Sequence, residues 1–405
     1  MSTKQVALLA EKRVAAAPAD EHGHASSVVD QYLRAAAAER ASDIHLEPKD
    51  DHVRVRFRIE GVLQERKGLP PDLGLAVISR LKMLGGMDMA ERRIPQDGRF
   101  SSVLAGTERT VRASVFPTIY GEKIVLRISS PARALRDLSE LGMPEPMIPV
   151  IRQALNRPSG MILTTGPSSS GRTSTLYSLI QLLDSGRRNI VTLEEGIEER
   201  LPSLTQGETN PRAGFTLASG LAAIEGQDPD VILVAELGDV ETAAGAFRLA
   251  MSGRLVLSSL LAGSTVETIT RLLDMGLEPF SVASGLSILI AQRLVRRLCE
   301  QCRVPVPADA GSLAVTLGFL PAELPETLYA PKGCELCGSS GYRGRVAIFE
   351  VVAVDDEIRD SIRSKSPTRV YRQLFASRQI PGLRREGWNR VRVGETTIDE
   401  VIRVC

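Results

Sequence analysis

Long apolar runs and excess charge are both scarce in this chain of 405 residues. Its most apolar helical stretch, Phe280 to Gln292, has 13 residues, fewer than the roughly 18 that a membrane-spanning helix needs. The first residues, MSTKQVALLAEKR, lack the long apolar core of a signal peptide. Fifty Lys and Arg against 49 Asp and Glu leave a charge of +1, so no overall attraction to nucleic acid or lipid is predicted. We therefore expect a cytoplasmic protein without a nucleic-acid partner, which reaches a membrane only through other proteins.

Cysteine and histidine are also few, and their positions are informative. Five cysteines are too few for a disulfide framework. The four histidines lie at positions 22, 24, 45 and 52. The later part of the chain therefore has no imidazole to use as an acid, a base or a phosphate sensor.

Composition and pattern predict a globular protein of several domains. Hydrophobic residues make up 43% and charged residues 24%, which are ordinary values for a soluble protein. At about 150 residues per domain, two or three domains are expected. The expected parts are a tail or linker (1–25), an α+β N-terminal domain (26–130), a hinge (131–145), an α/β core (146–298), a tetracysteine insertion (299–345) and a helical C-terminal region (346–405).

Hydrophobic periodicity distinguishes the two larger parts. In the first, a helical pattern runs from Ser26 through VVDQYLRAAAAERA, and a second helix is expected over 75–93. Segments of strand character are expected at 42–48, 53–65, 98–104, 109–117 and 123–129. In the second, short apolar strands at 161–166, 189–195, 230–236 and 254–260 alternate with helices, the last of them over 280–298. This alternation predicts a mostly parallel sheet covered on both faces.

A candidate phosphate-binding loop follows the strand at 161–166. The segment Gly166-Pro-Ser-Ser-Ser-Gly171-Arg172-Thr173 fits G-x-x-x-x-G-K-[ST] except for the lysine. Glycines in such a loop let backbone N–H groups surround phosphate oxygens at a helix N-terminus. A Ser/Gly-rich surface turn is the alternative. The candidate nucleotide-binding residues are Gly166, Ser168, Ser169, Ser170, Gly171, Arg172, Thr173 and Ser174.

The arginine at position 172 changes what the loop is expected to do. Arg172 keeps the positive charge that reaches the β and γ phosphates, but it replaces a compact ammonium with a longer planar fork. Its extra length is expected either to displace the γ-phosphate or to turn the side chain away. Ser169 adds strain if its φ is positive, where glycine is preferred. Binding of ATP is therefore expected to survive better than hydrolysis.

Two further strands end in carboxylates. Glu236 ends the apolar strand Val231-Ile-Leu-Val-Ala, and next to the strand of the phosphate loop it would lie at Mg²⁺ together with the hydroxyl of Thr173. Glu194 and Glu195 end another strand, where one of them would orient or deprotonate a water molecule. Taken singly, each acid is as readily explained as a cap on the following helix.

Four of the five cysteines form two C-x-x-C pairs. The pairs are Cys299 with Cys302 and Cys334 with Cys337, a spacing typical of a closed structural Zn²⁺ site with four thiolates. Four reduced buried thiols and a redox role are the alternatives. Cys405 lies apart from both pairs.

From about Ser26 to the C-terminus, the chain resembles the ATPases of type II secretion and type IV pilus assembly. The matching segments are Ala41-Ser-Asp-Ile-His-Leu-Glu-Pro48, Ala90-Glu-Arg-Arg-Ile-Pro-Gln-Asp-Gly-Arg99, Gly121-Glu-Lys-Ile-Val-Leu-Arg127, Gln227-Asp-Pro-Asp230, Arg271-Leu-Leu-Asp-Met-Gly-Leu-Glu-Pro-Phe280 and Ala291-Gln-Arg-Leu-Val-Arg-Arg-Leu-Cys299.

The resemblance implies a P-loop (RecA-like) motor domain with a mostly parallel sheet, a smaller α+β domain before it and a zinc-binding insertion. It implies ATP, Mg²⁺ and Zn²⁺ as cofactors, and nucleotide placed between the two domains of a hexameric ring. The ring would be a homohexamer or a mixed hexamer with an active relative, working on an inner-membrane platform protein to assemble pilins or pseudopilins. Glu194 and Glu236 match catalytic acids, and Arg112 and Arg127 match arginines presented to the phosphates.

The departures from the family pattern cluster around the nucleotide. The acidic box reads Glu-Glu-Gly in place of Glu-Asp-Pro, and the two histidines of the histidine box are absent. The substituted positions are Arg172, Glu195, Gly196, Gly238, Arg254 and Leu261. Hydrolysis is therefore expected to be weak or absent, and the alternative function is a catalytically impaired paralogue that acts as a regulatory or structural ring subunit.

Overall fold

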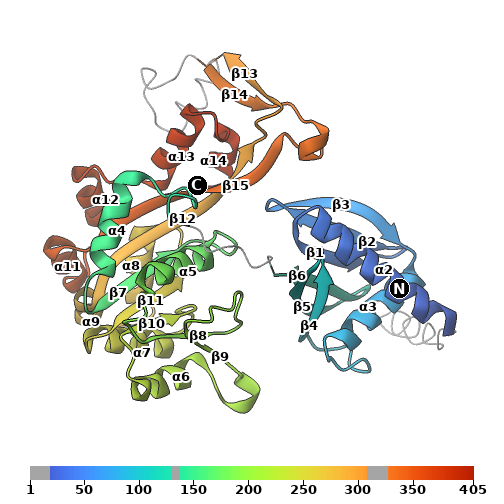
Figure 1. The fold of residues 1–405 in the computed structure, drawn as a ribbon, viewed down its shortest axis with the longest axis horizontal. Coiled ribbons are helices and arrows are strands. Elements are labelled where there is room, and N and C mark those ends of the chain that lie inside the picture. The colour runs from blue at the N-terminus through green and yellow to red at the C-terminus, as the bar shows by residue number, and fades with distance from the viewer. Residues whose placement is uncertain (1–18, 130–136, 308–326) are drawn as a thin grey trace, which may run out of the picture. The chain divides into compact units, whose positions relative to one another are not determined.

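The computed structural model describes residues 19–129, 137–307 and 327–405. The chain forms two compact units, Met1–Ala132 and Arg133–Cys405 (Figure 1). Most of the tail expected over 1–25 lies outside the described residues, as does part of the hinge expected over 131–145.

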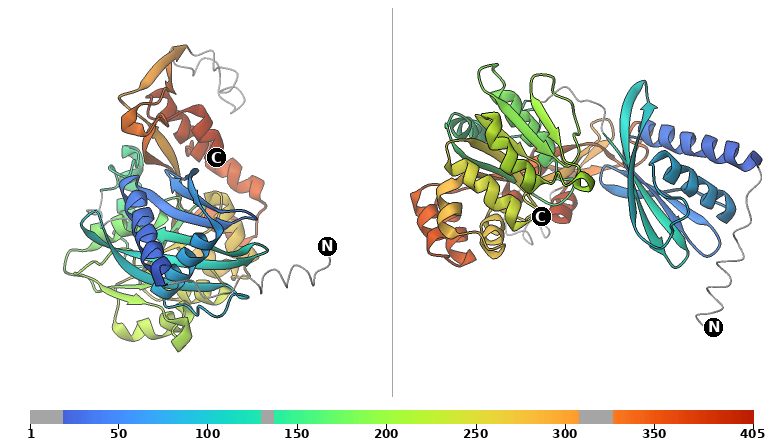
Figure 2. Two further views of the ribbon diagram at one scale, coloured as in Figure 1. Left: turned by 90° about the vertical axis from the view of Figure 1, so that its right-hand side faces the viewer. Right: turned by 90° about the horizontal axis from the view of Figure 1, so that it is seen from below.

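The first unit is an antiparallel sheet with two helices on one face (Figure 2). The strand order is β3-β2-β1-β6-β5-β4. Apolar side chains of both helices pack on those of the sheet, and Leu33, Ile44 and Ile78 are among the buried ones. Its elements are α2 (Ala19–Ala38), β1 (Ala41–Pro48), β2 (Val53–Ile59), β3 (Val62–Leu69), α3 (Pro71–Leu84), β4 (Gln96–Leu104), β5 (Thr107–Thr118) and β6 (Gly121–Ile128).

Two expectations for the first unit were wrong, both at glycines. The segment expected as one strand over 53–65 is the hairpin of β2 and β3, because Glu60 and Gly61 take positive φ values of 47° and 82°. The helix expected over 75–93 begins earlier and ends at Leu84, where Gly85 and Gly86 follow, the latter with a φ of 66°.

The second unit contains a seven-stranded sheet that confirms the mostly parallel α/β expectation. The order is β15-β12-β7-β11-β10-β8-β9, and only β15 runs antiparallel to its neighbour. Two helices pack on one face, α4 (Ile148–Leu155) and α5 (Arg172–Leu183). Six pack on the other: α6 (Leu217–Ile224), α7 (Val240–Met251), α8 (Thr265–Asp274), α9 (Pro279–Gly285), α11 (Asp356–Arg363) and α12 (Thr368–Ser377). The strands are β7 (Gly160–Thr165), β8 (Ile190–Glu194), β9 (Thr205–Glu208), β10 (Val231–Val234), β11 (Leu255–Leu260), β12 (Leu286–Leu298) and β15 (Tyr342–Ala353).

The helix expected over 280–298 is instead a short helix followed by a long strand. Helix α9 (Pro279–Gly285) leads directly into β12, which lies between β7 and β15. Because β12 is buried on both faces, its sequence has no alternation to separate it from a buried helix. None of the described helices is long and apolar enough to cross a membrane.

The C-terminal region is mainly helical, but it begins in a strand, since β15 runs to Ala353. A small hairpin of β13 and β14 precedes it. The fully buried indole of Trp388 packs with Val295 and Val401 in a separate apolar cluster. The elements not yet given are β13 (Arg303–Pro307), β14 (Thr327–Pro331), α13 (Leu383–Arg392) and α14 (Ile398–Val404).

Candidate functional site

The candidate phosphate loop joins the end of β7 to the start of α5, as the sequence predicts. Gly166 and Gly171 have φ values of 158° and 93°. The left-handed conformation considered for Ser169 is present, with a φ of 64°, and it costs about 1–2 kcal/mol in a residue other than glycine. The loop therefore has the backbone of a phosphate cradle, with one strained serine in it.

The side chain of Arg172 turns towards the acid strand. Its Nη2 donates to Oε2 of Glu236 at 3.0 Å, and only 12% of the side chain is exposed. Its Nη1 is buried and finds no partner among the described residues, and the same is true of Oγ of Ser170. A cation with an unused donor beside a glycine cradle fits a bound phosphate group.

The acid strand is not the neighbour of the phosphate-loop strand, and that expectation was wrong. Strand β11 lies between β7 and β10. The carboxyl ends of parallel strands share one edge of the sheet, so the first residues beyond β10 still reach the loop. The ion pair between Arg172 and Glu236 is the direct evidence of this.

Glu194 lies inside the unit, and only 3% of it is exposed. Its carboxylate accepts hydrogen bonds from Thr192 Oγ1 at 2.7 Å, from Gln206 Nε2 at 3.3 Å and from the hydroxyl of Tyr177. Burial raises the pKa of Tyr177, and the hydrogen bond to Glu194 raises it further. Glu194 thus ties β8 to α5 and β9, and the catalytic role expected of it stays a prediction.

Glu198 is a further acid at this edge, and its place there was not predicted from the sequence. Its Oε1 accepts a hydrogen bond of 3.4 Å from Oγ1 of Thr173, and its side chain is exposed. The signal available was an acidic run of four glutamates at 194, 195, 198 and 199. Thr173, Glu198 and Glu236 supply a hydroxyl and two carboxylates, the oxygen donors that Mg²⁺ prefers, so the donor set fits this ion.

The two positions of the missing histidine box lie at opposite ends of β11. Arg254 comes just before the strand and pairs with Glu225 at 3.5 Å. Leu261 comes just after it, next to Ala262, whose carbonyl accepts a 3.3 Å hydrogen bond from Thr165 at the end of β7. Position 261 is therefore on the edge that carries the phosphate loop, and position 254 is not.

The arginines matched by resemblance, Arg112 and Arg127, lie opposite each other on β5 and β6 of the first unit. Nε of Arg127 donates to Oδ1 of the buried Asp43 at 2.9 Å, while 65% of the arginine side chain stays exposed. Both arginines are thus held on an open polar face of the sheet. Their role at the phosphates stays a prediction.

The four paired cysteines come together. Sγ of Cys299 lies 3.9 Å from that of Cys334, and Sγ of Cys302 lies 3.8 Å from that of Cys337. The four Sγ atoms all lie within 4.8 Å of one another. Backbone N–H groups of Cys334 and Gly341 point at Sγ of Cys337 at 3.2 Å, as in thiolate sites for metals. This donor set fits structural Zn²⁺.

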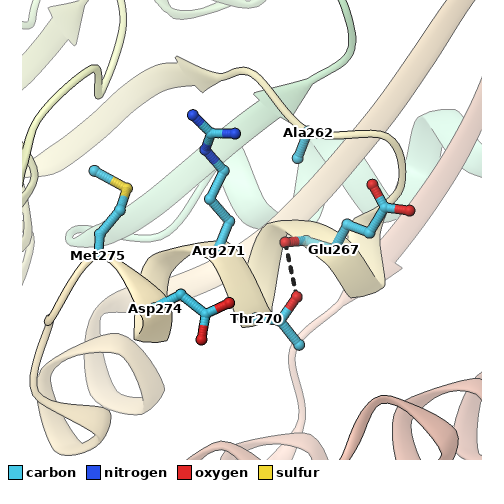
Figure 3. A pocket seen from close by; sticks show the side chains of 6 residues that line it. All are labelled: Ala262, Glu267, Thr270, Arg271, Asp274 and Met275. Atoms are coloured by element: carbon cyan, nitrogen blue, oxygen red, sulfur yellow. Dashed lines mark hydrogen bonds between the residues drawn. The ribbon is translucent and has the colours of Figure 1, made fainter.

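A pocket of about 440 Å³ lies on α8, apart from these groups (Figure 3). Glu267, Arg271 and Asp274 line it with mixed charge, and Thr270 donates to the Glu267 carbonyl at 3.1 Å. It contains none of the residues of the phosphate loop or the acid strands, so it is not the predicted nucleotide site.

Comparisons with known proteins agree with the fold and the motifs. Residues 18–403 match the family model described as "Type II/IV secretion system protein". The type II secretion system protein E of Aeromonas hydrophila is 39% identical over 387 residues, which are 95% of this chain and 76% of that protein. The type IV pilus assembly ATPase PilB of Thermus thermophilus is 39% identical over 380 residues, or 93% of this chain and 42% of its own.

Solved structures share the fold at lower identity. The Legionella pneumophila ATPase DotB has a TM-score of 0.65 and 19% identity, over 93% of this chain and 95% of its own. The pilus retraction motor PilT with bound ADP has a TM-score of 0.59 and 22% identity, over 93% and 96%.

Proposed function

This chain belongs to the type II/IV secretion system protein family, and from that premise we propose that it is an ATP-binding motor of a type II secretion or type IV pilus assembly machine. It couples ATP binding and hydrolysis to the assembly of pilins or pseudopilins. The observation that carries the proposal is the meeting of the phosphate loop with two carboxylates, Glu198 and Glu236, at one edge of the sheet.

The residues of this edge divide the chemistry between them. Backbone N–H groups between Gly166 and Thr173 hold phosphate oxygens at the start of α5. Thr173 and Glu236 would hold Mg²⁺, which would supply positive charge against the phosphates. Glu198 is exposed and therefore able to orient a water molecule. Glu194 also ends β8 at this edge, and the resemblance implies that it is a catalytic acid.

The ion pair between Arg172 and Glu236 is the reason why we expect slow ATP hydrolysis. A carboxylate that accepts from a guanidinium is less available to the metal ion, because the two cations compete for it. Phosphate oxygens offer Arg172 another partner, so nucleotide releases Glu236 by exchange. Turnover would then be slow but measurable.

An impaired paralogue with a regulatory or structural place in the ring is the second candidate. The observation that favours it is that Leu261 and Arg172, two substituted positions, lie on the same edge of the sheet. Under either candidate the assembly is a hexamer, as a homohexamer or mixed with an active relative. It works in the cytoplasm on an inner-membrane platform protein, with the cysteine cluster holding structural Zn²⁺.

The decisive experiment measures ATP binding and turnover on one zinc-loaded sample of the wild type and of Arg172→Lys. We expect both to bind ATP and the lysine variant to turn over about tenfold faster, because the shorter ammonium leaves Glu236 to the metal ion. Binding without turnover in both proteins would favour the regulatory candidate. Absence of nucleotide binding in both would contradict an ATP-dependent function.

A further inference from the structure

Strand β12 runs beside the phosphate-loop strand and carries a buried glutamine beneath the loop. Gln292 is 1% exposed, and its Nε2 donates to the carbonyl oxygen of Ser170 at 2.8 Å. Gln292 belongs to the segment Ala291–Cys299, one of the segments in which the chain resembles its family.

The loop fits against β12 so closely that two of its residues have to be glycine. A Cβ on Gly166 would lie 2.6 Å from the carbonyl oxygen of Gln292. A Cβ on Gly171 would lie 3.0 Å from Nε2 of the same residue and 3.6 Å from the side chain of Leu294. The shape of the loop is therefore set by β12 as well as by the loop's own sequence.

The hydrogen bond from Gln292 also orients a peptide group. In a planar trans peptide the C=O and the N–H point in opposite directions. Because the carbonyl of Ser170 points to Gln292, the N–H of Gly171 points away from β12. This N–H lies at the N-terminus of α5, where donors are available for an anion.

The next residue joins the same strand to two other segments. Arg293 donates through Nε to the carbonyl of Val404, at the end of α14, at 2.9 Å. Its Nη2 donates to the carbonyl of Gly263, in the loop after β11, and its Nη1 to the carbonyl of Gln292 at 3.0 Å. One guanidinium thus links α14, the loop after β11 and the glutamine.

We propose that Gln292 and Arg293 are positioning residues for the nucleotide. Gln292 fixes the peptide between Ser170 and Gly171, so that its N–H faces the phosphate, and Arg293 transmits a change in the loop to α14. This inference rests on the proposed ATP-dependent function. The carboxamide oxygen of Gln292 and the hydroxyl of Ser170 are both buried and without partners among the described residues. Buried polar atoms without a hydrogen-bond partner are rare in protein interiors. Their presence here indicates that the contact between Gln292 and Ser170 serves a purpose other than packing.

The first test compares Gln292→Met with Gln181→Met, a matched control at an exposed position on α5. Methionine has a similar length but no donor. We expect the Kd for Mg-ATP to rise about tenfold or more, and amide hydrogen exchange in 166–172 to become faster without nucleotide. The control should change neither quantity. Equal affinity and equal exchange in Gln292→Met would overturn the proposal.

Two further variants separate positioning from folding. Gln292→Glu places a carboxylate opposite the carbonyl of Ser170, so affinity should fall at neutral pH and recover in part when the acid is protonated. A loss that does not depend on pH would count against the hydrogen bond.

Arg293→Lys tests the link between the loop and α14. We expect ATP to slow amide hydrogen exchange in residues 398–404 of the wild type but not of this variant. If ATP slows exchange equally in both proteins, Arg293 does not transmit a change in the loop to α14.

Amide hydrogen exchange measured without nucleotide separates the proposed ATP-dependent function from the proposed role of Gln292. If the wild type binds no ATP, the proposed function fails. Faster exchange of 166–172 in Gln292→Met would still support Gln292 as the group that fixes the loop, and unchanged exchange would overturn that as well.

Discussion

The cysteine cluster and the phosphate loop would bind their ligands through different kinds of donor atom. In the cluster the donors would be the four Sγ atoms, which lie within 4.8 Å of one another. In the loop they would be backbone N–H groups, whose directions depend on φ and ψ and, in our proposal, on the hydrogen bond from Gln292. A side chain that is itself the ligand can be replaced only by another side chain that binds the same metal. A loop of backbone donors can accept Arg172 in place of lysine and keep its shape.

The largest effect is expected at the cluster. Cys334→Ser removes one thiolate, and we expect loss of bound zinc and unfolding of the insertion, because apparent Zn²⁺ binding energies of about 10–16 kcal/mol are folding energy in such sites. Zinc per chain and thermal unfolding are the measurements. Cys405→Ser is the control, since Cys405 is not one of the four clustered cysteines. A Cys334→Ser protein that retains zinc and its melting temperature would show that this cluster is not the metal site.

The difference between the cysteine cluster and the phosphate loop also explains how much of each site can be predicted from the sequence. The four cysteines come together as their spacing predicts, and the loop glycines have positive φ values, as a glycine-rich loop between a strand and a helix allows. Both features depend on local sequence, and the binding roles of these residues stay predictions. The ion pair of Arg172 with Glu236 was not predicted, although an arginine that turns away was expected. The pair joins residues 64 apart in sequence, and their distance depends on the strand order.

The fold shows the same division between local and distant information. Strands β4, β5, β6 and β7 agree with their expected segments, since alternation or short apolar runs bounded by turns mark them. Strand β12 was taken for a helix because burial on both faces removes the alternation. Glu198 was missed because it lies four residues beyond the end of β8, and only the folded chain brings it to Thr173.

The second largest effect is expected for Glu236, the side chain near the loop that we assign to Mg²⁺ binding. Glu236→Gln keeps the shape of the side chain but removes the charge that we assign to Mg²⁺. We expect turnover to fall about 10²- to 10³-fold, the scale for one lost electrostatic group in an active site. ATP binding should remain, because backbone N–H groups hold the phosphates and Arg172 is released from its pair.

Turnover and ATP binding, measured in parallel, check this expectation against Glu225→Gln. Glu225 pairs with Arg254 before the first residue of β11, at the other edge of the sheet. If Glu236→Gln hydrolyses ATP at the wild-type rate, Glu236 has no part in the metal site. If both variants lose activity equally, the effect is general and not local.

The smallest effect tests whether the lost histidines matter equally. Positions 254 and 261 flank the six residues of β11, so they lie about 20 Å apart along the strand. Leu261→His returns an imidazole to the edge of the phosphate loop, and we expect turnover to rise about three- to fivefold. The gain is modest because Arg172 and Gly238 remain, and groups that act together are not additive.

Arg254→His should leave turnover unchanged, because the opposite edge has no path to the phosphates, and the double variant should match Leu261→His alone. Steady-state rates of the three proteins decide this. A gain at position 254 as large as that at 261 would mean that imidazole acts through the strand and not at the nucleotide. The loop would then differ from the cysteine cluster in a further way, because its activity would depend on side chains that lie far from the bound group.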